Sequence, residues 1–197
     1  MIHYDDFASL FPLGDAITGV QPVSASMLPE PYCALLNHTK HMTVTVEKYF
    51  RDPVEVVVED WDQDGDFYCR RILLRTKTQG QFVQFGVVRI DLGMLTEPVR
   101  EQILGQRLPL GRVLIEHNVL TNVKPVAFLK VSLGPQLTTA FDCPYPATTY
   151  ARIGQISANG RPAIDVLEVL RPLMEHHSEP HVDSHGPHRD RQGPVPH

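Results

Sequence analysis

Two charged residues stand inside apolar, strand-like segments, and their chemistry is the first indication of function. Arg70 lies in DFYCRRILLRTKTQGQFVQFGVVRID (residues 66–91), which predicts two strands joined by a polar turn at 76–80. Because side chains alternate between the two faces of a strand, Arg70 shares the more apolar face with Ile72 and Leu74. We therefore predict that Arg70 faces the core, while Arg71 and Arg75 face outward into solvent.

The last predicted strand repeats this arrangement with the opposite charge. In AIDVLEVL (residues 163–170), Glu168 shares a face with Val166 and Leu170. A guanidinium stays protonated and is costly to bury unless an anion meets it. Two explanations are open: Arg70 and Glu168 form a buried ion pair, or they line a pocket. In a pocket, Arg70 would bind a ligand carboxylate and Glu168 would donate or withhold a proton.

Composition excludes several classes of protein. A chain of 197 residues with 42% hydrophobic and 21% charged residues is typical of a soluble globular domain. The net charge of −5 argues against general nucleic-acid binding, and no apolar run has the length of a membrane span. The three cysteines are widely spaced and form no CxxC pair, so we expect free thiols in a cytoplasmic protein.

The remaining local patterns predict a series of short elements. They are a short helix near residues 32–36, a hairpin of strands 42–50 and 54–60, an acidic turn at 61–65, a helix capped by Thr96 and ended by Gly105, a turn at Gly111, a strand at 125–133, a proline-rich loop at 134–149 and a hairpin turned at Asn159-Gly160.

These elements predict three regions of the chain. Residues 1–23 form an irregular N-terminal arm, residues 24–174 form the folded domain, and residues 175–197 form a disordered tail rich in histidine and proline. The tail holds six of the ten histidines, but their scattered spacing does not predict a physiological metal site.

Four segments, in this order, resemble the chorismate pyruvate-lyase (4-hydroxybenzoate synthase) family. They are LPEPYCALLNHTKHMT, YCRRILLR, PLGRVLIEHNVLT and NGRPAIDVLEVL, which together cover roughly residues 28–172. The resemblance implies an α+β fold in which helices and flaps cover an internal pocket on a six-stranded antiparallel sheet. It also implies a carbon–oxygen lyase that eliminates pyruvate from chorismate to give 4-hydroxybenzoate, without a cofactor or metal.

The resemblance also assigns roles to individual residues. Arg70 would clamp the carboxylate of a small cyclic substrate, and Glu168 would help the enolpyruvyl group to leave. The backbone amides of Met42 and Leu110 would lie against the ligand. A second pocket arginine of the family falls near Gly86, where the nearest arginine is Arg89.

The offset of three residues puts Arg89 on the opposite face from Gly86, unless a β-bulge resets the register. If Arg89 is external, a pocket with one arginine suits a monocarboxylate better than the dianion chorismate. Two alternatives therefore stay open. One is a diverged enzyme that catalyses another elimination, dehydration or cyclisation. The other is a non-catalytic ligand-binding module like the effector modules of bacterial transcription regulators, although the broken first 30 residues do not predict a helix-turn-helix.

Overall fold

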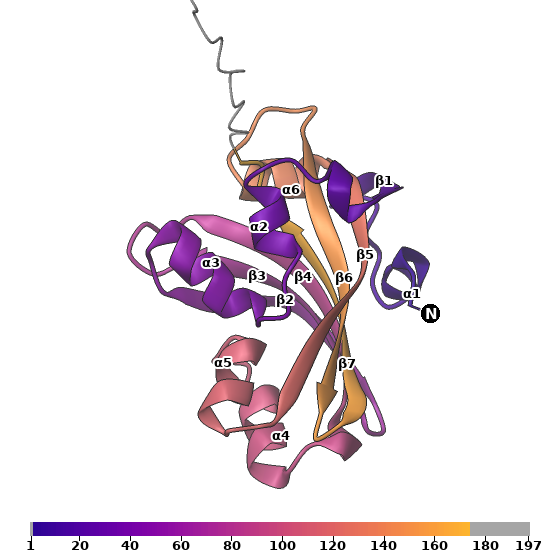
Figure 1. The fold of residues 1–197 in the computed structure, drawn as a ribbon, viewed down its shortest axis with the longest axis vertical. Coiled ribbons are helices and arrows are strands. Elements are labelled where there is room, and N and C mark those ends of the chain that lie inside the picture. Colours follow the sequence, from indigo (N-terminus) through magenta and orange to yellow (C-terminus); the bar gives the residue numbers. More distant parts are fainter. Residues whose placement is uncertain (1, 174–197) are drawn as a thin grey trace, which may run out of the picture.

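The computed structural model describes residues 2–173, so the predicted tail lies outside the described residues. Within this range the chain forms one seven-stranded antiparallel sheet with the strand order β1-β5-β6-β7-β4-β3-β2 (Figure 1). The strands are β1 (Ile17–Val23), β2 (Val54–Asp64), β3 (Phe67–Thr76), β4 (Phe82–Asp91), β5 (Thr121–Leu133), β6 (Thr148–Ala158) and β7 (Arg161–Leu170). The helices are α1 (Tyr4–Ala8), α2 (Tyr32–Leu36), α3 (Met42–Phe50), α4 (Glu97–Leu104), α5 (Leu110–Glu116) and α6 (Pro135–Ala140). The predicted α+β antiparallel fold is confirmed, with seven strands rather than six.

The two strand pairs at the centre of the sheet form where the sequence predicts them. β3 and β4 are joined by a turn that ends at Gly80, whose φ of +68° is costly for other residues. β6 and β7 meet at Asn159 and Gly160, with φ of 51° and 81°. Left-handed conformations at both turn residues give a twist that matches the flanking strands, which explains why Asn-Gly favours this hairpin.

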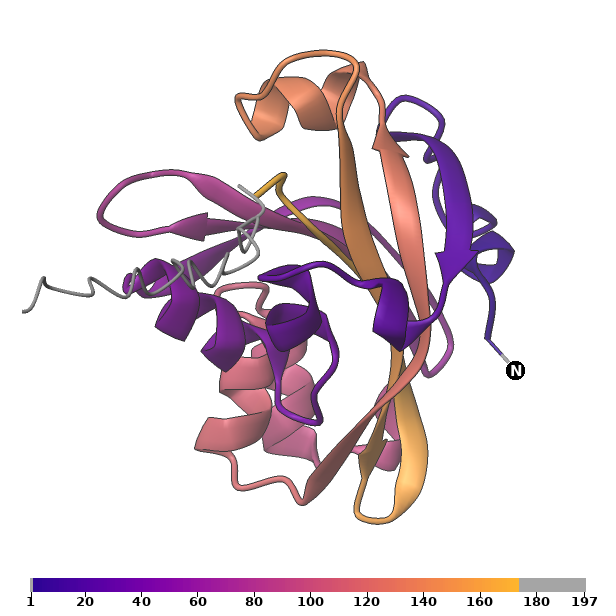
Figure 2. The ribbon, with the colours of Figure 1, turned by 45° about the horizontal axis from the view of Figure 1, so that its top comes forward.

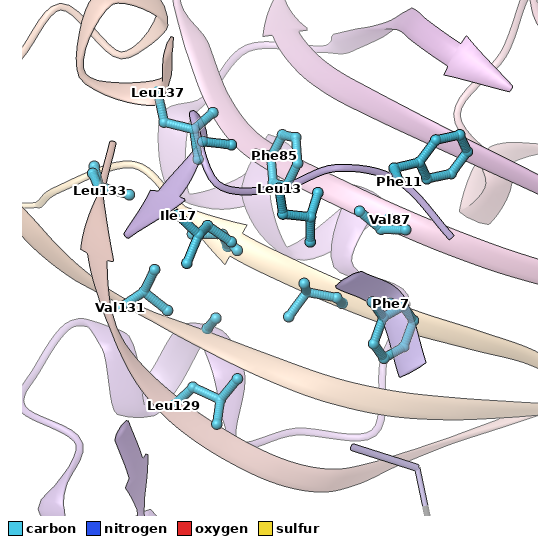
Figure 3. Close-up of a cluster of buried hydrophobic side chains, with 14 of the residues drawn as sticks. Phe7, Phe11, Leu13, Ile17, Phe85, Val87, Leu129, Val131, Leu133 and Leu137 are labelled. Atoms are coloured by element: carbon cyan, nitrogen blue, oxygen red, sulfur yellow. The ribbon is translucent and has the colours of Figure 1, made fainter. Parts of the chain in front are cut away.

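Both faces of the sheet are covered, by different parts of the chain. Helices α2 to α5 lie over the inner face, and the N-terminal segment with α1 lies over the outer face (Figures 1 and 2). On the outer face, Phe7 and Phe11 pack with Phe85 and other apolar side chains of the strands (Figure 3). Even the outward-facing Arg71 lies beneath this segment, where its Nη1 donates to the carbonyl oxygen of Pro12 at 3.2 Å. The prediction that this face meets solvent is therefore wrong for much of its area.

Residues 42–50, predicted as a strand, form helix α3 instead. The alternation of apolar residues in MTVTVEKYF suggested a strand, but burial follows a helical spacing: Met42, Thr43 and Val46 are buried while Val44 is exposed. Packing of this helical face on the sheet overrides the intrinsic preference of its β-branched residues. Strand β2 pairs with β3, so the hairpin predicted for 42–60 is absent from the described residues.

Other predicted boundaries need smaller corrections. Residues 17–23, expected to be irregular, form the edge strand β1 along β5. The acidic segment 61–64 continues strand β2, and the turn follows at Gly65. The expected turn at Gly111 lies inside α5, the expected loop 134–149 contains α6, and β5 begins four residues earlier than predicted. The helix between Thr96 and Gly105 is confirmed at both ends.

The packing of the N-terminal segment gives a test of its structural role. We expect Phe7→Ala to lower the free energy of unfolding by about 3–5 kcal/mol, because Phe7 is 1% exposed and its removal leaves a cavity in the outer-face core. Phe67→Ala is the matched control, since Phe67 is 53% exposed and its loss should cost no more than about 0.5 kcal/mol. Urea unfolding measures both; equal effects would show that the segment does not stabilise the sheet.

Candidate functional site

A cavity lies on the inner face of the sheet, beneath α3 and α5. Its walls include Met42 and Leu110 from the helices and Arg70, Gln84 and Glu168 from the strands. Its volume is about 50 Å³, room for a few water molecules. A larger ligand would therefore require the covering helices, or the loop that joins α2 to α3, to move outward.

The register of the sheet brings the cavity residues together. Gly86 on β4 stands between Ile72 on β3 and Glu168 on β7, and Glu168 in turn stands opposite Arg152 on β6. Directly opposed residues in antiparallel strands point to the same face. Gly86 has no side chain, and the Ile72 side chain packs close to it: a Cβ at this position would lie 3.3 Å from Ile72 Cδ1.

Arg70 enters this cavity as a buried cation without an anionic partner. Its side chain is 1% exposed, and among residues 2–173 its Nε and Nη1 atoms have no hydrogen-bond acceptor. Burial lowers the pKa of the guanidinium, an effect that the adjacent Tyr68 partly opposes. The Tyr68 hydroxyl accepts a hydrogen bond from Gln106 Nε2 at 2.7 Å, which fixes that ring beside the guanidinium. Two buried N–H groups of Arg70 are therefore available to a ligand.

Glu168 has a different partner from the one that the sequence suggested. Its Oε2 accepts a hydrogen bond from Arg152 Nε at 2.5 Å, and the Arg152 side chain is 1% exposed. Arg152 and Glu168 thus form the buried ion pair, and within residues 2–173 Arg70 is left without an anionic partner.

Arg152 also holds a loop over the cavity. The lid loop, residues 37–41, joins α2 to α3. Arg152 Nη1 donates to the carbonyl oxygens of Leu36 and His38 at 3.3 and 3.1 Å, and Nη2 donates to that of Lys40 at 3.4 Å. At its far end the loop is fixed by a 2.9 Å hydrogen bond between His41 Nε2 and Thr121 Oγ1. The ion pair in the cavity and the position of the lid loop are therefore physically connected.

The surroundings of the two histidines of the lid loop lower the pKa of both side chains. His38 Nδ1 accepts a hydrogen bond from the Lys40 amide at 3.1 Å and lies 3.4 Å from Arg152 Nη1, so a proton on Nδ1 would face two donors. Burial, and then the Arg152 charge, lower the pKa of His38. Burial also lowers the pKa of His41.

The structure brings together most of the residues that the sequence singled out. Arg70, Glu168, Met42 and Leu110 all line the one cavity, while Arg89 does not. Arg89 lies on the opposite face, where its Nη2 is 2.6 Å from Asp165 Oδ2. The β4–β7 ladder is regular through Gly86, so no bulge turns Arg89 inward. The placement of Arg89 among the ligand-binding residues is corrected accordingly.

Arg152 is the residue that sequence reasoning missed. A regular two-residue hairpin at Asn159-Gly160 would pair it with Leu167, on the outer face. A register shift between Ile156 and Ser157 pairs it with Glu168 instead and turns it inward. The occurrence of an arginine in the largely apolar β6 segment is the sequence feature that could have indicated Arg152. The face of the sheet on which its side chain lies cannot be assigned, however, without knowing the position of the bulge.

Two further results bear on the class of site. Among residues 2–173, no group of three or more His, Cys, Asp or Glu side chains could hold a metal ion. None of the helices in the same range is long and apolar enough to cross a membrane.

The comparisons with known proteins find similarity in structure but not in sequence. No family model matches the chain, and no curated protein matches it. The effector domain of PhnF from Mycobacterium smegmatis superposes with a TM-score of 0.50 and 9% identity, covering 77% of this chain and 91% of that domain. The PhnF structure from the same organism gives a TM-score of 0.50 and 8% identity, covering 68% of this chain and 64% of PhnF. The possible transcriptional regulator YydK from Bacillus subtilis gives 0.43 and 9% identity, covering 59% of this chain and 58% of YydK.

The fold is therefore that of the PhnF effector domain, a chorismate-lyase-like α+β domain. The chain spans about 58–64% of the length of YydK and PhnF.

The prediction of a carbon–oxygen lyase is contradicted by this comparison. The PhnF domain, of which this chain covers 91%, is described as an effector domain and not as a lyase. The site agrees with the correction, because Glu168, the expected catalytic acid, is held by the Arg152 guanidinium.

The two inward arginines should have opposite effects on stability. We expect Arg70→Met to raise the free energy of unfolding of the ligand-free protein by roughly 1–4 kcal/mol, because it removes a buried charge that has no anionic partner. Arg152→Met should lower it by roughly 3–5 kcal/mol, because Glu168 is left buried and unpaired. Chemical denaturation of both variants measures the difference. Destabilisation by both would mean that Arg70 has a structural partner.

The neutral histidines predict a loss of stability in acid. Because the pKa of His38 is lowered in the folded protein, the unfolded chain binds this proton first as the pH falls below about 6.5, and unfolding is favoured from there down to the folded pKa. We expect His38→Asn to flatten the fall in melting temperature between about pH 7 and pH 5. His41, which has the same direction of shift, should leave a residual slope. Identical slopes in wild type and variant would show that His38 does not control this effect.

Proposed function

We propose that this chain is a non-catalytic small-ligand-binding module that takes an organic monoanion into the cavity beneath the lid loop. The observation that carries the proposal is Arg70, a 1% exposed guanidinium whose Nε and Nη1 have no acceptor within residues 2–173. Such a group is costly unless an anion arrives. A carboxylate forms strong charge-assisted hydrogen bonds with a guanidinium, and Nε and Nη1, on different edges of the group, each offer a donor.

The charge of the site favours a monoanion. Arg152 and Glu168 neutralise each other at 2.5 Å, so Arg70 contributes the one unbalanced charge among the cavity residues that the structure describes. A dianion would bring a second negative charge into an apolar cavity with no cation to meet it, at a large desolvation cost. A small carboxylate, such as the cyclic carboxylate expected from the sequence, is the ligand class that this balance supports.

Ligand entry would be coupled to the lid loop. Arg152 joins the interior of the cavity to the carbonyl oxygens of residues 36, 38 and 40. A ligand that displaces Arg152 or Glu168 would therefore loosen the lid loop. The name of the PhnF effector domain is consistent with a role in which occupancy of the cavity is reported to another domain or partner.

A thermal-shift screen tests the proposal. Purified protein is heated with a panel of small aliphatic and aromatic monocarboxylates, and matched dicarboxylates serve as the competing class. A monocarboxylate at 100 times its Kd should stabilise the wild type by about 2.7 kcal/mol. Arg70→Met should abolish that shift. Arg89→Met is the matched control, since it removes an arginine on the opposite face and should keep the full shift.

Two outcomes would contradict the proposal. One is an equal shift in wild type and Arg70→Met, which would place the anion elsewhere. The other is a consistent preference for the dicarboxylates, which would contradict the charge balance of the cavity.

A further inference from the structure

A second unsatisfied polar group lines the same cavity as Arg70. Gln84 on β4 is 3% exposed, and within residues 2–173 its Oε1 atom has no hydrogen-bond donor. Buried amide oxygens in folded proteins nearly always accept a hydrogen bond. An orphan acceptor and two orphan donors in one cavity indicate a ligand with complementary groups.

The sheet register separates these two groups along the cavity. Gln84 stands opposite Leu74, four residues along β3 from Arg70, so their Cα positions differ by about 13 Å in the strand direction. Gly86 lies midway between them, opposite Ile72, whose side chain packs close to the glycine. The neighbours of Gln84 across the sheet are Leu74 and Leu170, so its amide is the polar group at an otherwise apolar end.

We infer that Gln84 is a second recognition point and that the ligand is an elongated monoanion with a hydrogen-bond donor at its far end. This inference rests on the proposed function. The carboxylate of the ligand would accept a hydrogen bond from Arg70 Nε or Nη1, its apolar middle would lie along Ile72 and Gly86, and a terminal hydroxyl would donate to Gln84 Oε1. The ligand class is thus a hydroxy acid whose hydroxyl is distant from its carboxylate.

The chemistry of the two groups explains why such a site would be selective. If a ligand without the hydroxyl binds, the amide oxygen of Gln84 stays buried without a hydrogen-bond donor. That lost hydrogen bond weakens the binding of the analogue. A site that hydrogen-bonds a ligand hydroxyl therefore rejects the isosteric methyl analogue far better than an apolar pocket rejects an added hydroxyl.

Pairs of ligands with equal numbers of heavy atoms test this. One pair is 6-hydroxyhexanoate and heptanoate, and a longer pair is 8-hydroxyoctanoate and nonanoate. A ring-based pair is 4-(hydroxymethyl)benzoate and 4-ethylbenzoate. Calorimetric titration of wild-type protein should show at least about a tenfold preference for the hydroxyl member in the pair of fitting length. Gln84→Met keeps the length of the side chain without an amide and should bring that ratio to one or below.

The outcomes separate this inference from the proposed function. Arg70→Met should lose binding of both members of a pair, whereas Gln84→Met should lose only the preference. Binding of both members without preference in the wild type, or an unchanged preference in Gln84→Met, would overturn the role of Gln84 and leave the anion site intact. Failure of every pair to bind the wild type would overturn both. If Gln84→Met does not fold, Gln84→Leu provides the same comparison.

Discussion

The burial of three charges on one face of a sheet is the constraint on which the rest of this structure depends. Arg70, Arg152 and Glu168 all point into an apolar layer, where an unpaired charge is costly. One cation and the anion neutralise each other, which leaves one cation over. This imbalance is the basis for the proposed binding site, because a buried guanidinium without an anionic partner costs free energy that a bound anion would recover.

The neutralised pair also organises the cover of the cavity. Arg152 extends past Glu168 to the carbonyl oxygens at the end of α2 and in the lid loop, so one side chain joins the sheet to the elements above it. Helix α5 is joined to α3 in a similar way, through Arg112 Nη2 and Glu47 Oε2 at 2.6 Å. Polar contacts thus position the cover, while apolar contacts on the outer face, such as those of Phe7 and Phe85, keep the sheet itself rigid. This division suits a cavity that must open without disturbing its floor.

Local sequence patterns determined the parts of the fold whose signals are short-range. The alternation in residues 66–91 gave the β3–β4 pair and the inward face of Arg70, and Asn159-Gly160 gave the last hairpin. The cap at Thr96 and the stop at Gly105 gave α4. Residues 42–50 were misassigned because alternating valines and threonines satisfy a strand pattern locally, whereas the face that is buried is chosen by packing against the sheet. Local sequence patterns do not predict the edge strand β1, because its extended conformation is stabilised by pairing with β5, which lies more than 100 residues away in sequence.

The candidate site shows the same contrast between what local sequence patterns predict and what only the tertiary structure decides. From the sequence alone, period-two alternation put Arg70 and Glu168 on inward faces, since that inference needs only their own strands. Which cation Glu168 meets was decided by tertiary structure. Ser157 pairs with Pro162 and Ile156 pairs with Ile164, so Ala163 is the extra residue that shifts the β6–β7 register. Because side chains alternate with period two, that single step places Arg152 opposite Glu168, on the cavity face, instead of opposite Leu167 on the outer face. The absence of a bulge at Gly86 likewise left Arg89 outside. A bulge has no local sequence pattern strong enough to reveal it; it is fixed by how the whole sheet packs.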